Sequence, residues 1–264
     1  MDSSPDLRWF NLDRLNLLIG LFLFLSFLAI NRVRARNLDS IYIRPLPGLK
    51  ALDEAIGRAT EMGRPILYVP GIGDMSEVGT LAAITISGPV ARRTAELGCE
   101  LRVPCYDPVV AALIDGVARQ AYSEANRSDS YIAGSVYYVS ATQFAYVASV
   151  TGTMLRDRPA ANIYMGAFYA ESLFLAETGN QTGAVQIAGC DQVTQLPFFV
   201  CSCDYTLLGE ELYAASAYLG REPDQLATIA AQDWAKALAV VVVLLGILFA
   251  LLGRPELGKW LQTS

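Results

Sequence analysis

The residues best placed to do chemistry lie in a glycine-rich turn that follows an apolar run. Gly71 and Gly73 come directly after the strand-like segment Pro65–Val69 (PILYV) and precede a helical pattern. In dinucleotide-binding folds, a turn of this kind lets the helix N-terminus hold a pyrophosphate. Asp107 follows the second strand-like run, where an acid that binds a ribose would lie. One hypothesis is therefore a nucleotide site.

The same turn, GIGDMSEVG, departs from the dinucleotide pattern. Its sixth position is Ser76 rather than glycine. Asp74 and Glu77 would repel a pyrophosphate at the N-terminus of the following helix. The alternative is a tight strand-to-helix turn in which the two glycines serve backbone geometry alone.

Carboxylates offer a second kind of chemistry. Ligands of open α/β sheets bind where the carboxyl ends of the strands meet, and hard divalent cations prefer oxygen ligands. Four acids follow strand-like runs and are candidates: Asp74, Asp107, Asp191 and Asp204. The alternative is that these acids cap helices, because a carboxylate at an N-cap accepts hydrogen bonds from orphan amides.

Composition excludes several classes of function. The chain has no histidine, which removes Ser-His and Cys-His nucleophiles and the commonest metal ligand. Its five cysteines are odd in number and form no CxxC pair, so neither a disulfide framework nor a zinc site is indicated. A net charge of −6 without a basic cluster in the central part argues against nucleic-acid binding. We assign no catalytic residue, metal site or cofactor from the sequence.

Short apolar runs alternate with helical patterns between residues 37 and 220. This alternation is typical of a parallel sheet with helices on both faces. We therefore expect a Rossmann-like, doubly wound α/β domain with a mostly parallel sheet of about six strands. The strand-like runs are Pro65–Val69, Glu100–Pro104, Ser135–Val139, Ala161–Met165, Ala184–Ala188 and Pro197–Cys201.

The helical patterns carry two further expectations. The stretch from Ser76 to Leu97 contains Gly88-Pro89, which predicts an interrupted helix. Asp204, after the last strand-like run, is predicted to cap the final helix of the domain.

Two uncharged apolar segments lie outside this domain, within residues 15–31 and 222–253. All three tryptophans of the chain, Trp9, Trp234 and Trp260, flank these segments. Tryptophan favours the membrane interface, so we predict one N-terminal and one C-terminal transmembrane helix. The second would continue a water-exposed stalk that starts near Pro223.

Basic residues predict the orientation. Arg32, Arg34 and Arg36 follow the first apolar segment on the side of the α/β domain. The positive-inside rule then places that domain in the cytoplasm of a two-pass protein of the cell (inner) membrane. Residues 1–14 and 254–264 would be extracytoplasmic.

Two helical stretches are more apolar than a small domain would cover, namely residues 141–154 and 206–219. Such faces predict self-association. The candidate assembly residues of the second stretch are Glu210, Glu211, Tyr213 and Tyr218. The two glutamates would meet a neighbouring subunit's basic residue, for example Arg156 or Arg158.

Three segments carry a resemblance to a known family: residues 67–84 (LYVPGIGDMSEVGTLAAI), residues 154–189, and residues 203–223 (CDYTLLGEELYAASAYLGREP). They resemble the hallmark blocks of an uncharacterised bacterial and archaeal membrane-protein family known only as a domain of unknown function. The resemblance covers residues 38–252 and implies membrane anchoring and a shared cytoplasmic domain. It implies no activity, cofactor or site residue.

The sequence favours a non-enzymatic scaffold that is anchored in the membrane and self-assembles through its cytoplasmic domain. The expected partners are the membrane, further copies in a large homo-oligomer and other membrane proteins. The alternative is a sensor or enzyme that binds a nucleotide or divalent cation at the acidic strand ends. The candidate ligand-binding residues are Gly71, Gly73, Asp74, Ser76, Asp107, Asp191 and Asp204.

Overall fold

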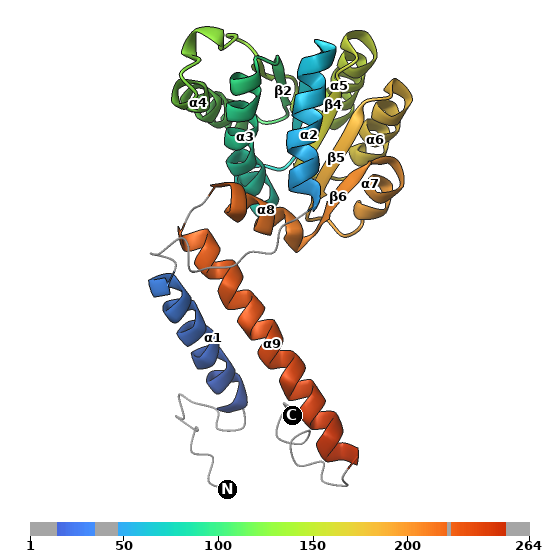
Figure 1. Cartoon of the computed structure of the whole chain (residues 1–264). Coiled ribbons are helices and arrows are strands. Elements are labelled where there is room, and N and C mark those ends of the chain that lie inside the picture. The colour runs from blue at the N-terminus through green and yellow to red at the C-terminus, as the bar shows by residue number, and fades with distance from the viewer. Residues whose placement is uncertain (1–14, 35–46, 221–222, 252–264) are drawn as a thin grey trace, which may run out of the picture. The chain divides into compact units, whose positions relative to one another are not determined.

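A computed structural model describes residues 15–34, 47–220 and 223–251 (Figure 1). The chain divides into two compact units. One spans Ile43–Gly220 and the other combines Met1–Tyr42 with Arg221–Ser264.

The larger unit contains a six-stranded sheet in which every pair of neighbours is parallel. The strand order is β3-β2-β1-β4-β5-β6. This is the order of dinucleotide-binding Rossmann folds, and the chain reverses direction across the sheet between β1 and β4. The predicted parallel α/β sheet is therefore confirmed. The strands are β1 (Ile66–Gly71), β2 (Leu101–Cys105), β3 (Val136–Tyr138), β4 (Ala161–Ala167), β5 (Val185–Cys190) and β6 (Tyr205–Leu208).

The strands are almost wholly apolar because both faces of the sheet are buried. In β1, Ile66 and Tyr68 belong to one core cluster, whereas Leu67 and Val69 belong to another. Successive side chains of a strand point to opposite faces, so the two clusters are the two sides of the sheet.

Three consecutive helices and one later helix contribute to the first cluster, and three other consecutive helices contribute to the second (Figure 1). The first set is α2 (Pro47–Met62), α3 (Val78–Leu97), α4 (Pro108–Glu124) and α8 (Glu210–Gly220). The second set is α5 (Gln143–Asp157), α6 (Glu171–Thr182) and α7 (Leu196–Ser202). A short 3-10 helix, η3 (Ser128–Ser130), precedes β3.

The predicted strand Pro197–Cys201 is wrong, because these residues belong to α7. A five-residue apolar run does not distinguish a strand from a helix, and Pro197 suits the first turn of a helix. Phe199 is buried against the rings of Tyr164 and Phe168. The sixth strand is Tyr205–Leu208, and the predicted helix cap at Asp204 is therefore also wrong.

The predicted interruption at Gly88-Pro89 is wrong too, since α3 runs through Pro89. Gly88 lies against α4, and a Cβ there would come within 3.1 Å of a Val117 methyl. Pro89 removes one backbone hydrogen bond from α3. The close packing of α3 on α4 at Gly88 offsets this loss, so the helix continues through the proline.

The smaller unit is described by two helices, α1 (Leu15–Arg34) and α9 (Pro223–Leu251), which lie side by side (Figure 1). Arg32 forms an ion pair with Asp224 at 3.0 Å, and the ring of Phe27 lies 6.3 Å from that of Trp234. These contacts join the end of α1 to the start of α9, so the helices run antiparallel.

Among the described residues, one helical segment, Asp224–Phe249, is long and apolar enough to cross a membrane. The apolar part of α1, Leu17–Val33, is shorter. The interface prediction for Trp9, Arg36 and Trp260 falls outside the described residues, and the side chain of Arg34 is not described.

Candidate functional site

The candidate site is the carboxyl end of β1 and β4, where the strand order reverses. The two strands meet there through glycines with positive φ, Gly71 at 80° and Gly166 at 135°. A Cβ at Gly71 would come within 2.2 Å of the Ala167 carbonyl oxygen, and one at Gly166 within 2.3 Å of that of Pro70. The glycines therefore allow a close approach of two backbones.

Gly73, the second glycine of the turn, is also enclosed by the chain itself. A Cβ there would come within 2.4 Å of Thr80 Oγ1 and 2.9 Å of the Ala167 methyl. The space that a dinucleotide fold leaves above this glycine for a phosphate is filled by side chains of the protein.

Asp74 and Ser76 form a local turn. The Ser76 amide donates to Asp74 Oδ1 at 2.8 Å, and its hydroxyl donates to the same oxygen. These hydrogen bonds hold the pKa of Asp74 below its usual range. The pair shapes the chain before α3 begins at Val78.

Asp191, at the end of β5, lies against the first turn of α3. All three of its carboxylate atoms would be within 3.0 Å of a Cβ at Gly79, the second residue of that helix. A helix N-terminus carries partial positive charge and favours an anion. The carboxylate of Asp191 thus occupies the region where a Rossmann fold binds phosphate.

Tyr213 of α8 holds this carboxylate, because its hydroxyl donates to Asp191 Oδ2 at 2.9 Å. Burial and this hydrogen bond to an anion raise the pKa of Tyr213, so the phenol remains protonated at neutral pH. Tyr213, predicted as an assembly residue, is therefore engaged within its own chain.

Glu171, at the start of α6, is the most buried carboxylate of this region, with 1% exposed. Its oxygens accept hydrogen bonds from the Gln143 side-chain amide at 2.6 Å and the Tyr169 backbone amide at 2.8 Å. Tyr169 in turn donates its hydroxyl to Glu77 at 3.0 Å, which raises the pKa of the phenol. The carboxylate is therefore satisfied by Gln143 of α5 and by the turn that leads into its own helix.

Two buried polar atoms of the site have no hydrogen-bond partner within the described part of the chain, namely Thr80 Oγ1 and Asp191 Oδ1. A buried polar atom without a partner costs stability. These two atoms are the ones in the site whose hydrogen-bonding capacity is not used by the described part of the chain.

The remaining predicted acids do not join this site. Asp107 caps α4, since its Oδ1 accepts hydrogen bonds from the amides of Val109 and Val110 at 2.8 and 2.9 Å. Asp204 precedes β6 and therefore lies at the opposite edge of the sheet, where its Oδ2 accepts from the Gln186 amide at 2.8 Å. Across residues 15–34, 47–220 and 223–251, no three acids or cysteines could together hold a metal ion.

The cysteines offer little nucleophilic chemistry. Burial raises the pKa of Cys105 and Cys203 to about 12 and that of Cys190 to about 11. A thiol with such a pKa is almost wholly protonated at neutral pH, whereas the thiolate is the reactive form. Only Cys201 is exposed among the five.

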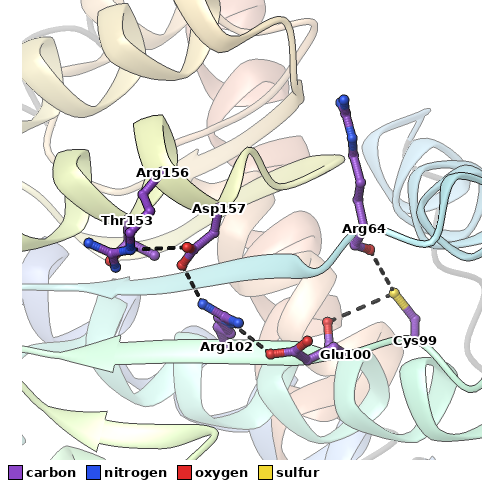
Figure 2. Close-up of polar contacts among 7 residues, drawn as sticks. All are labelled: Arg64, Cys99, Glu100, Arg102, Thr153, Arg156 and Asp157. Carbon is purple, nitrogen blue, oxygen red and sulfur yellow. Dashed lines mark hydrogen bonds and ion pairs between the residues drawn. The ribbon is translucent and has the colours of Figure 1, made fainter.

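The opposite edge of the sheet is rich in arginine (Figure 2). Arg102 of β2 reaches Asp157 at the end of α5 and binds Glu100 at 2.7 Å. Arg156 binds the same aspartate at 3.1 Å, and Arg158 follows it in an exposed position. This edge therefore carries both arginines and acids, whereas the segments that follow the strands at the other edge carry acids and no arginine.

The two stretches predicted to self-associate differ in the structure. Helix α8 buries Leu212, Ala215 and Ala217 and packs on α3. Glu211, also predicted for assembly, accepts a hydrogen bond from the Leu208 amide at 3.0 Å. Tyr218 is 45% exposed. Helix α5, in contrast, exposes apolar side chains.

The roles of Thr80 and Tyr169 were missed by sequence reasoning. Thr80 lies inside a helical pattern and packs on a glycine seven residues earlier, which no motif describes. Tyr169 follows the carboxyl end of β4, and that position is the sequence feature that could have indicated a role for it at the site.

No curated protein and no solved structure matches this chain. The family model described as "Domain of unknown function (DUF6754)" matches residues 5–260, which is nearly the whole chain. The chain therefore belongs to this family of unknown function.

Proposed function

We propose that this protein is a membrane-anchored, non-enzymatic scaffold that self-assembles through its α/β domain. The observation that carries the proposal is an apolar surface on helices α5, α6 and α7 and the loop before α7. Seven large apolar side chains are exposed there: Phe144, Leu155, Leu173, Phe174, Val193, Phe198 and Val200.

The extent of this surface is close to that of a protein interface. A fully exposed large apolar side chain presents roughly 200 Å², so these seven together expose on the order of 700 Å². Stable interfaces bury about 800 Å² on each partner. Covering the surface would therefore supply most of the area of one interface.

The length and apolar composition of α9 support membrane anchoring, and we propose α1 as a second, shorter span packed against it. Arg32 and Arg34 in the last turn of α1, together with Arg36 two residues later in the sequence, favour a cytoplasmic α/β domain and a two-pass topology in the cell membrane. In this arrangement, copies are confined to one plane, which raises their effective concentration for assembly.

Native mass measurement of the full chain in mild detergent tests the proposal. We expect a large homo-oligomer that dissociates when Phe144 and Phe174 are both replaced by serine. The matched control replaces Val78 and Val109, which are exposed on α3 and α4. A wild-type protein that is a monomer at every concentration would refute self-assembly.

The acids of α8 make a separate contribution to the proposal. We expect Glu210 to approach Arg156 or Arg158 of a neighbouring copy. E210K should then weaken the oligomer, and R156E in the same chain should restore it. An oligomer that is indifferent to both changes contradicts this pairing.

A ligand sensor or enzyme is the second candidate, and the strand order with the unpartnered atoms of Thr80 and Asp191 favours it. Calorimetry and thermal shift with NADH, ATP, calcium and magnesium test it. Binding that D191N abolishes would support this candidate. The absence of both binding heat and a shift in melting temperature would exclude nucleotide and divalent-cation binding.

A further inference from the structure

The outward side of α5 is uncharged from Gln143 to Leu155. Phe144 is 73% exposed and Leu155 56% exposed. Between them, Ala145, Ala148 and Ser149 are exposed as well. Side chains three or four residues apart lie on one side of a helix, so these residues form a single stripe, the α5 stripe.

The α5 stripe contains both a projection and a notch. Phe144 projects from its N-terminal half. In its C-terminal half, Gly152 has no side chain, and a Cβ built there would meet nothing within 4 Å. The notch is therefore open to the outside and is not filled by the protein's own chain.

Projection and notch are placed symmetrically about Ala148, four residues on either side. If two α5 helices pack antiparallel with Ala148 at the two-fold axis, Phe144 of each copy lies over Gly152 of the other. An isologous interface requires this kind of self-complementarity, and small residues between the two sites let the helices approach closely.

Charge favours the antiparallel direction. The segments that follow the strands contain seven acids and no Lys or Arg: Asp74, Glu77, Asp107, Glu171, Asp191, Glu210 and Glu211. Helix α5 begins at that edge, and its C-terminal end at the other edge carries Arg156 and Arg158 on either side of Asp157. Antiparallel pairing brings Arg156 and Arg158 of one copy toward the strand-end acids of the other.

We infer that α5 is the pairing helix of this protein, with a second copy of the chain as its partner and Phe144 seated on Gly152 across a two-fold axis. This inference rests on the proposed scaffold function and specifies one of its contacts. Assembly beyond the pair uses other surfaces, such as α6 and α7.

Cysteine cross-linking of the full chain in detergent tests the geometry. In a C201S background, which removes the exposed native thiol, A148C would place two thiols at the axis. We expect mild oxidation to convert most of this variant into a covalent dimer. A112C, exposed on α4, is the matched control and should remain monomeric on denaturing gels.

Filling the notch tests the contact independently of cross-linking. G152L should weaken dimerisation by about tenfold or more, which corresponds to roughly 1.4 kcal/mol. G116L is the matched control, because Gly116 of α4 also has nothing within 4 Å of its Cβ position. Circular dichroism and thermal unfolding check that both variants fold.

The outcomes separate this inference from the proposed function. A wild-type oligomer in which A148C fails to cross-link, or in which G152L assembles like G116L, overturns the α5 pairing but leaves the scaffold standing. A wild-type monomer overturns both. Equal cross-linking of A148C and A112C would indicate random collision and would also contradict the pairing.

Discussion

Helices α5 and α8 are both poor in charge, but the protein uses them differently. Helix α8 turns Leu212 and Ala215 into the core beside α3, and its Tyr213 reaches Asp191. Helix α5 buries Tyr146, Val150 and Met154 but leaves Phe144 and Leu155 outside. The difference teaches that an apolar helix predicts a partner without saying whether that partner lies in the same chain.

The largest expected effect concerns α8, the helix that packs on the core of its own chain. L212A removes a fully buried side chain and should lower the free energy of unfolding of the full chain by roughly 2–5 kcal/mol. F144A on α5 should change it by less than about 0.5 kcal/mol. Denaturant unfolding under conditions that keep the protein monomeric measures both. Equal losses would erase the distinction between the two helices.

The contact between α8 and the strand ends comes next. Y213F removes the hydrogen bond to Asp191 and leaves that carboxylate without its donor. We expect a loss of about 1–3 kcal/mol in the free energy of unfolding. Y218F, on the exposed side of the same helix, is the control and should be neutral. A neutral Y213F would mean that water replaces the phenol.

Glycine substitutions extend the comparison to the backbone. At Gly189, a Cβ would lie 2.8 Å from Met165 Sδ and 3.0 Å from a Leu212 methyl, so G189A should destabilise by about 1–3 kcal/mol. G152A should stabilise the monomer by roughly 0.5–1 kcal/mol, because alanine is the better helix former. Thermal unfolding distinguishes the signs. Destabilisation by G152A would show that the notch on α5 is not open.

The smallest effect depends on pH. Hydrogen bonds from Arg92 and Arg93 lower the pKa of Glu96 on α3. A lowered pKa in the folded state gives stability that is present above the unfolded pKa and is lost as the pH falls through the folded pKa. E96Q should therefore cost at most about 1 kcal/mol at pH 7 and progressively less as the solution becomes acidic. A cost that persists in acid would contradict the ion-pair origin.

The sequence predicted much of the fold, because buried parallel strands are short apolar runs and five of the six expected runs are strands. It failed at Pro197–Cys201, where a short apolar run fits either structure and tertiary packing of Phe199 decides. The site was harder to predict. Asp191 lies on Gly79 through a contact across 112 residues, and local spacing carries no information about it.

The contact between Asp191 and Gly79 has a thermodynamic consequence. A protein that keeps an anion site for a cofactor gains stability only when the cofactor is bound, and its melting temperature rises with cofactor concentration. Here the anion is covalently part of the chain and is present at a fixed, very high local concentration. The folded state therefore carries its own negative charge at this helix N-terminus, and the stability gained from that contact does not depend on the concentration of any ligand.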